Sequence, residues 1–327
     1  MADRTPADLI YACRPEGRVG AFHRPEPRGG TLARRTGVDR SPLPHLALPS
    51  RARPARAIVV RSSLSSPIKP VKPLAPWIGG KRNLAGRIIE RLADIPHQLY
   101  VEPFVGMGGI FLRRPTRSPV EVINDFGKDV ATLFRILQRH YVPFLDMLRY
   151  QLSSRAEFQR LTKTDPETLT DLERAARFLY LQRTVFGGKV TAQTFGVSTT
   201  SPARFDITKL VPMLEDVHER LAGVTIECLP YSDFIRRYDR PATLFYLDPP
   251  YFGCEDDYGA DLFGREDFAV LAQQLAGIAG RFVLSLNDCP EVRELFAAFH
   301  IEQVDTTYTI RGHGTSKPAR ELIIRNL

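Results

Sequence analysis

The stretch TLFYLDPPYFG, residues 243–253, ends in residues that could hold an amine. The first five residues are β-branched, aromatic or leucine, which is typical of a buried strand. Ligands of doubly wound α/β sheets bind beyond the carboxyl ends of the strands, and Asp248 would lie there. Pro249 and Pro250 donate no N–H, so the Asp248 carboxylate and a proline carbonyl offer two acceptors without a donor. This arrangement favours binding of an –NH2 group.

Tyr251 adds a flat aromatic face to these acceptors. An aromatic ring that bears the amine could stack on that face. The four residues together predict recognition of the exocyclic amine of a nucleic-acid base. For an isolated D-P-P-Y, the preferred interpretation is a rigid turn that caps a strand, so further motifs are needed to support base recognition.

A second pattern, VEPFVGMGGIF at residues 101–111, predicts a strand and then a glycine turn that opens a helix. Such a turn lets a ligand approach the backbone closely. Gly106 and Gly108 match the first glycines of G-x-G-x-x-G, but Phe111 stands at the third, and the chain has no P-loop motif. Asp125 follows the next predicted strand, where an acid can bind ribose hydroxyls. We therefore expect a nucleoside-containing cofactor, with no indication of NAD.

Strands and helices alternate at both ends of the chain, which predicts a mostly parallel α/β sheet. Residues 141–186 are helical by period, and residues 187–206 form a polar loop rich in Gly, Ser and Thr. The other expected helices are 84–92, 128–138, 208–221, 232–237, 265–279 and 290–298. The expected strands are 99–103, 119–124, 224–229, 243–247, 281–286, 300–308 and 320–325.

The net charge of +8 is concentrated in one segment. Residues 1–70 contain 13 of the 45 Lys and Arg but 5 of the 37 Asp and Glu, so the rest of the chain holds 32 of each. The segment also has 10 of the 26 prolines and little apolar periodicity, so it is predicted to be a disordered basic arm. It could add non-specific phosphate affinity, or be an extension without a function.

Composition excludes several other classes. No apolar run approaches the roughly 18 residues that span a bilayer, and no apolar segment follows the basic N-terminus as in a signal peptide. The four cysteines form no C-x-x-C pair, so neither a metal site nor a disulfide framework is indicated. We expect a cytoplasmic protein with reduced thiols, without a metal or a membrane partner.

Several motifs, in one order, resemble those of the Dam-type (α-group) DNA adenine-N6 methyltransferases. WIGGK at 77–81 resembles their N-terminal motif, and EPFVGMGG at 102–109 resembles their S-adenosylmethionine turn. The tetrad Asp248–Tyr251 is similar to their catalytic motif. The further matches are NDF at 124–126, FLYLQRTVFGG at 178–188, YSDF at 231–234, LSLND at 284–288 and ELIIRNL at 321–327. The resemblance covers about residues 73–327.

The resemblance implies a Rossmann-like methyltransferase sheet with an inserted, mostly helical target-recognition region. The catalytic domain would comprise 71–139 and 210–327, and the recognition region 140–209, after a basic arm at 1–70. A basic balance of 12 to 7 over residues 135–209 is compatible with a DNA-facing segment.

The implied reaction transfers a methyl group from S-adenosylmethionine to N6 of an adenine flipped out of double-stranded DNA, at a specific sequence. Asp248 and the Pro249 carbonyl would accept the amine hydrogens, and Tyr251 would stack on the base. The implied catalytic residues are Asp248, Pro249, Pro250 and Tyr251. The implied cofactor-binding residues are Trp77, Lys81, Glu102, Phe104, Gly106, Gly108, Asp125, Asp233 and Asp248, with Asp125 at the ribose and Asp233 near the cofactor adenine.

Two departures from the family pattern stand in and after the recognition loop. Gly187 and Gly188 occupy positions where the family often has Asn and Gly, and the loop that follows differs, so no target sequence is implied. The alternatives are an RNA base-amine methyltransferase and a non-enzymatic DNA-binding protein that retains the fold. A protein-glutamine methyltransferase would usually have Asn in place of Asp248. Neither an oligomeric state nor an accompanying restriction enzyme is indicated.

Overall fold

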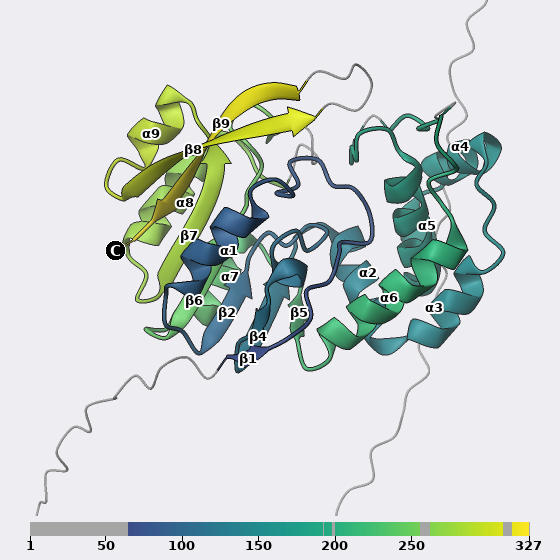
Figure 1. Ribbon diagram of the computed structural model, residues 1–327, viewed down its shortest axis with the longest axis horizontal. Helices are drawn as coiled ribbons and strands as arrows, with labels where there is room; N and C mark the ends of the chain where they lie inside the picture. The colour runs from purple at the N-terminus through teal and green to yellow at the C-terminus, as the bar shows by residue number, and fades with distance from the viewer. Residues whose placement is uncertain (1–64, 192, 198–199, 256–261, 310–315, 327) are drawn as a thin grey trace, which may run out of the picture. The chain divides into compact units, whose positions relative to one another are not determined.

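The computed structural model describes residues 65–327, apart from 192, 198–199, 256–261, 310–315 and 327. Most of the predicted basic arm at 1–70 lies outside the described residues. The central feature is a sheet of seven described strands in the order β5-β4-β2-β6-β7-β9-β8 (Figure 1). The strands are β2 (Leu99–Glu102), β4 (Val120–Asn124), β5 (Thr225–Glu227), β6 (Thr243–Leu247), β7 (Arg281–Asn287), β8 (His300–Thr309) and β9 (Ser316–Arg325).

Five neighbouring strands pair in parallel, and of the strands described in this sheet only β9 runs in the opposite direction. Strand β2 pairs with β4 and β6, with Leu99 opposite both Val120 and Thr243, and β6 continues in parallel to β7. Strand β9 lies antiparallel between β7 and β8, with Asn287 of β7 opposite Glu321. This arrangement confirms the predicted mostly parallel sheet. The carboxyl ends of β2, β4 and β6 meet at one edge, as ligand sites of such sheets require.

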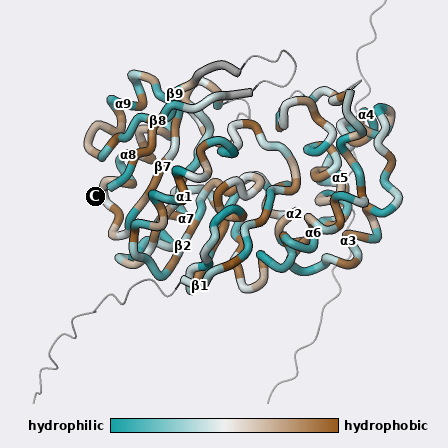
Figure 2. The backbone as a smooth tube through the Cα atoms, viewed as in Figure 1, coloured by the Kyte–Doolittle hydropathy of each residue, from teal (hydrophilic) through white to brown (hydrophobic). Residues whose placement is uncertain are grey.

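Helices cover both faces of the sheet because the strands alternate in the direction of their side chains. One buried cluster contains Tyr100, Tyr246 and Val283 together with residues of α1, α2 and the helices within 141–184. The other contains Val101 and Phe245 together with residues of α7, α8 and α9. In Figure 2, hydrophobic stretches follow the central strands. The helices on the two faces are α1 (Ala85–Ala93), α2 (Lys128–Arg139), α7 (Tyr231–Tyr238), α8 (Asp267–Ala276) and α9 (Pro290–Leu295).

The predicted helical block is divided into α3 (Tyr141–Leu148), α4 (Arg155–Lys163) and α5 (Asp171–Thr184). The divisions fall where polar side chains cap new helices: Ser154 accepts from the Glu157 N–H, and Thr170 forms a capping box with Glu173. Helices α3 and α5 pack on α2, and α6 (Ile207–Leu221) packs on α2 and α3 (Figure 1). Contacts place residues 58–327 in one compact unit, which includes this block.

One expectation for the glycine turn was wrong. The turn was expected to open a helix, but it leads into a single 3-10 turn, Phe111–Arg113, with Arg114 already extended. Pro115 follows, and a proline disfavours helical backbone in the residue before it. The chain then forms a short antiparallel pair, which the sequence did not predict, between β3 (Thr116–Arg117) and β1 (Ser66–Pro67).

Candidate active site

The tetrad follows β6 directly, between the carboxyl ends of β2 and β7. One carboxylate oxygen of Asp248, Oδ1, lies 2.5 Å from the Lys81 ammonium and accepts a hydrogen bond of 3.2 Å from the Ser285 hydroxyl. Ser285 is itself 2.9 Å from the Tyr246 hydroxyl. Pro249 and Pro250 are buried. The tetrad is therefore fixed at one oxygen of its carboxylate.

Lys81 is buried, with 3% of its surface exposed, although it carries a charge. Its ammonium also donates to the Tyr251 hydroxyl at 2.9 Å and to the Gly79 carbonyl at 3.2 Å. A buried ammonium is strongly unfavourable unless it is paired and hydrogen-bonded, and the Asp248 carboxylate supplies that pairing. The family resemblance implied that Lys81 binds the cofactor. In the structure its ammonium contacts Asp248 and Tyr251 of the tetrad.

Opposing effects act on the Asp248 carboxyl. Burial raises its pKa, and the charge and hydrogen bond of Lys81 together with the Ser285 hydroxyl lower it. Lys81 therefore favours the ionised form of the acid. Glu102, which ends the neighbouring strand β2, is buried and accepts a 2.6 Å hydrogen bond from Tyr100; burial raises its pKa to about 8. Burial therefore favours the neutral form of Glu102.

The Tyr251 hydroxyl takes part in the site as well as the ring. It donates to Glu321 Oε1 at 2.5 Å and accepts from Lys81, whose ammonium lies 4.3 Å from the ring centre. Sequence reasoning treated Tyr251 as an aromatic face and missed Glu321 and Ser285. The matches at LSLND and ELIIRNL were the signals that could have drawn attention to them.

The glycine turn, Trp77 and Asp125 form a second cluster. Gly106 has φ +49°, and its N–H donates to Asp125 Oδ2 at 2.8 Å, while Gly127 donates to Oδ1 at 2.8 Å. A Cβ at Gly106 would lie 2.7 Å from the Trp77 indole nitrogen. Burial raises the pKa of Asp125 to about 6, and the two backbone N–H groups oppose the rise. Three residues far apart in sequence are thus brought together.

The remaining predicted cofactor residues differ in their surroundings. Gly108 has φ +73° and leaves room for Leu112, since a Cβ there would lie 2.8 Å from Leu112 Cγ. The Phe104 ring packs 5.5 Å from Tyr231, the first residue of α7. Asp233, in the first turn of α7, is half exposed and forms an ion pair with Arg236. The Asp233 carboxylate is therefore paired at the surface.

The helical block is tied to the WIGGK segment by Gln182 of α5. The Gln182 amide donates to the Pro76 carbonyl at 2.8 Å and to the Gly188 carbonyl at 2.7 Å, and the Gly188 carbonyl also accepts from Ile78. Gly187 and Gly188 have φ values of +76° and +75°. Asn tolerates this left-handed region better than most residues, so the departure from the family at Gly187 keeps the backbone conformation.

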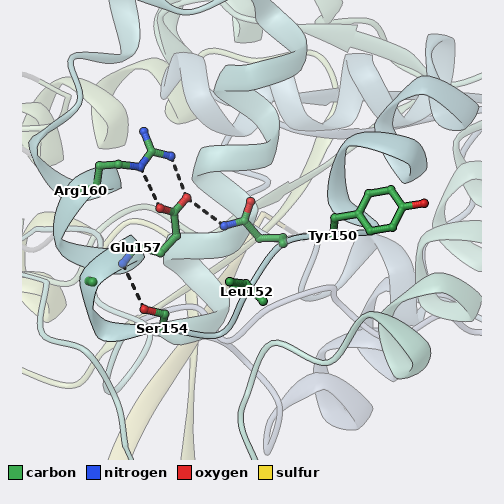
Figure 3. A pocket seen from close by; sticks show the side chains of 7 residues that line it. Tyr150, Leu152, Ser154, Glu157 and Arg160 are labelled. Carbon is green, nitrogen blue, oxygen red and sulfur yellow. Dashed lines mark hydrogen bonds and ion pairs between the residues drawn. The ribbon is translucent and has the colours of Figure 1, made fainter.

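A separate hollow of about 440 Å³ lies at the start of α4 and shares no residue with the tetrad (Figure 3). Its polar side chains bond one another: Glu157 accepts from Gln151 and from Arg160, and Tyr150 points away. We assign it no chemistry. Within the described residues no group of His, Cys, Asp and Glu could hold a metal ion, and no helix is long and apolar enough to cross a membrane.

The sheet order, the glycine turn and an acid–Pro–Pro–Tyr tetrad held by a lysine define an α/β enzyme of the methyltransferase class. The family model of the D12 class N6 adenine-specific DNA methyltransferases matches residues 77–310. The chain belongs to this family. It is an adenine-specific DNA methyltransferase, as the resemblance implied, and the family requires a methyl donor and a DNA substrate.

Individual relatives cover most of the chain. The chain is 24% identical to the Type II methyltransferase M1.LlaDCHI of Lactococcus lactis subsp. cremoris, over 78% of this chain and 95% of the relative. It is 22% identical to the Type II methyltransferase M.CviBI of Paramecium bursaria Chlorella virus NC1A, over 78% of this chain and 100% of the relative. It is 27% identical to the DNA adenine methylase of Escherichia coli (strain K12), over 76% and 92%.

Proposed function

We propose that the protein takes its methyl group from S-adenosylmethionine and transfers it to N6 of an adenine flipped out of double-stranded DNA at a specific sequence. One observation carries the proposal: Asp248 is fixed through Oδ1 by Lys81 and Ser285, and no donor among the described residues bonds Oδ2. A fixed carboxylate with one oxygen available is suited to accept a hydrogen from an amine.

The residues of the site act mainly by positioning and by electrostatics. Asp248 Oδ2 and the Pro249 carbonyl accept the two hydrogens of the amine, which keeps the nitrogen lone pair available for attack. Tyr251 provides the face on which the flipped base stacks, and stacking of this kind compensates part of the cost of unstacking it from the duplex. The sulfonium of S-adenosylmethionine supplies an already activated methyl group.

Trp77, Glu102, Phe104, Gly106, Gly108, Asp125 and Asp233 are the proposed binding residues for this cofactor. The residues present fit such a group, because Gly106 and Gly108 turn the backbone at positive φ and the Gly106 N–H lies beside the Asp125 carboxylate. Asp125 directly follows β4, and two backbone N–H groups hold its carboxylate, so its oxygens are oriented for ribose hydroxyls.

We expect Gly106→Ala to weaken S-adenosylmethionine binding by about tenfold, because a Cβ at φ +49° is strained and would displace the Trp77 indole. Equilibrium binding of the cofactor measures the effect. Gly187→Ala is the matched control, since its φ of +76° is also positive but a Cβ there meets nothing within 4 Å. Equal affinities of the two variants for S-adenosylmethionine would contradict a role of Gly106 in the cofactor site.

Residues 140–209 are the proposed target-recognition region, and residues 71–139 and 210–327 the catalytic domain. Two observations support this division. Residues 135–209 contain 12 basic and 7 acidic residues, and Gln182 bonds the Pro76 carbonyl next to the WIGGK segment. Exchanging the block for that of a relative is expected to change the methylated sequence and leave cofactor affinity similar. Long-read sequencing of DNA from expressing cells measures the site, and an unchanged site would reject the assignment.

The proposed function is tested by incubating the protein with labelled S-adenosylmethionine and DNA, RNA or protein. We expect label in N6-methyladenine of double-stranded DNA. Label in RNA alone would favour an RNA base-amine methyltransferase, and no label with DNA still bound would favour a binding protein that retains the fold. A DNA substrate also supports a cytoplasmic location.

A further inference from the structure

Three side chains on one face of the sheet hold the loop that carries the tetrad. Asn287 and Glu321 are paired directly across β7 and β9, so their side chains lie on the same face, and Ser285 lies two residues before Asn287. Ser285 bonds Asp248, and Glu321 bonds the Tyr251 hydroxyl. Asn287 accepts from the Phe252 N–H at 2.9 Å and donates to the Phe252 carbonyl at 3.0 Å.

Glu321 is the member of this set that the catalytic scheme leaves unexplained. It is 1% exposed, and burial raises its pKa while the Lys81 charge and the Tyr251 hydroxyl lower it. One oxygen, Oε1, accepts from Tyr251, and the other, Oε2, is buried without a hydrogen-bond partner among the described residues. A buried carboxylate in this state is costly for a protein that needs only a stable sheet.

We propose that Glu321 is a positioning residue for methyl transfer, which fixes the Tyr251 ring through its hydroxyl and shares the charge of Lys81 with Asp248. The proposal rests on the proposed function of the tetrad. The strand pairing fixes the Glu321 backbone on both sides, opposite Asn287 and Val304, so the carboxylate is a rigid point of attachment.

The contacts define a chain from Glu321 to the reacting carboxylate. Glu321 accepts from the Tyr251 hydroxyl, which accepts from Lys81, which in turn is paired with Asp248. Without Glu321, the Tyr251 hydroxyl loses this acceptor, so one of the contacts that orient the ring is removed. The Lys81 ammonium would also have one carboxylate nearby in place of two. Glu321 thus acts on the amine through Tyr251 and Lys81, without contact with the amine itself.

The test compares Glu321→Gln, Glu321→Leu, Tyr251→Phe and the double variant Tyr251→Phe/Glu321→Leu in the full chain. Glutamine keeps an acceptor for the hydroxyl and removes the charge, whereas leucine removes both. The readouts are the single-turnover methyl-transfer rate with saturating DNA, the dissociation constants of S-adenosylmethionine and DNA, and thermal unfolding without cofactor. Glu294→Gln, on the exposed surface of α9, removes the same charge far from these contacts in the chain.

We expect the rate to fall about tenfold for Glu321→Gln and about a hundredfold for Glu321→Leu, with both dissociation constants within about threefold of the wild type. The double variant should be no slower than Glu321→Leu, because the hydroxyl and the carboxylate act as one unit. Glu294→Gln should match the wild type.

The proposal would be overturned if the rate of the double variant fell by the product of the two single-variant losses, or if Glu321→Gln had the wild-type rate. If Glu321→Leu does not fold, the proposal is tested by Glu321→Gln and Tyr251→Phe. Both should lower the methyl-transfer rate without weakening the binding of S-adenosylmethionine or DNA. A wild-type protein that transfers no methyl group to DNA would instead contradict the proposed function.

Discussion

Asp248→Ala is expected to reduce methyl transfer to DNA by about a hundredfold to a thousandfold or more, the range found when a preorganised catalytic contact is removed. The variant removes both Oδ1, which Lys81 and Ser285 hold, and Oδ2, which is proposed to accept the amine hydrogen. The loss should appear in the single-turnover rate. S-adenosylmethionine binding should be retained, since Gly106 and Asp125 are unchanged.

This variant also leaves the buried Lys81 ammonium without its carboxylate. Breaking a buried pair in this way costs about 3 kcal/mol or more of unfolding free energy. The double variant Asp248→Ala/Lys81→Met removes both charges. It should therefore be more stable than Asp248→Ala, as measured by thermal unfolding, and remain inactive. Recovery of activity together with stability would show that Asp248 serves the fold and not the chemistry.

Lys81→Met is expected to shift the pH dependence of methyl transfer. The Asp248 carboxyl must be ionised to accept the amine hydrogen, burial raises its pKa, and Lys81 lowers it. Without the ammonium the pKa rises further, so the acidic limb of the pH–rate profile should move to higher pH. Activity should therefore be lost first at the acidic end of the wild-type range and partly recover as the pH is raised.

The control for this prediction is Lys72→Met, which removes the same charge from an exposed position. Its profile should overlay that of the wild type. If Lys81 instead contacts the cofactor, as its place in WIGGK implied, Lys81→Met would weaken S-adenosylmethionine binding and leave the acidic limb where it was. Measuring binding and the profile on the same preparation separates the two roles.

The features that depend on neighbouring residues could be predicted from the amino-acid order. The alternation of strands and helices predicted the α/β sheet, and the elements around Asp125 and Asp248 fall within a few residues of their expected bounds. Glycines at 106 and 108 and the acid at the end of the tetrad strand are local signals, because backbone conformation and strand ends depend on neighbouring residues.

Local order also misled in two places. The glycine turn was expected to open a helix, and Pro115 stops it after one 3-10 turn. The apolar period of 141–186 was continuous enough to indicate helix throughout, and the caps at Ser154 and Thr170 divide it. In both cases single residues with a specific backbone or capping effect outweighed the periodicity of the segment.

The contacts that hold the site together could not be predicted in this way, because they join residues that are distant in the chain. Lys81 and Tyr251 are 170 residues apart, Tyr251 and Glu321 are 70 apart, and Gln182 is 106 residues from Pro76. Contacts across such separations leave no period or spacing in the sequence, because they arise when parallel strands align their carboxyl ends and an antiparallel strand brings Glu321 beside them. The pairing of β7 with β9 therefore decides which carboxylate meets Tyr251.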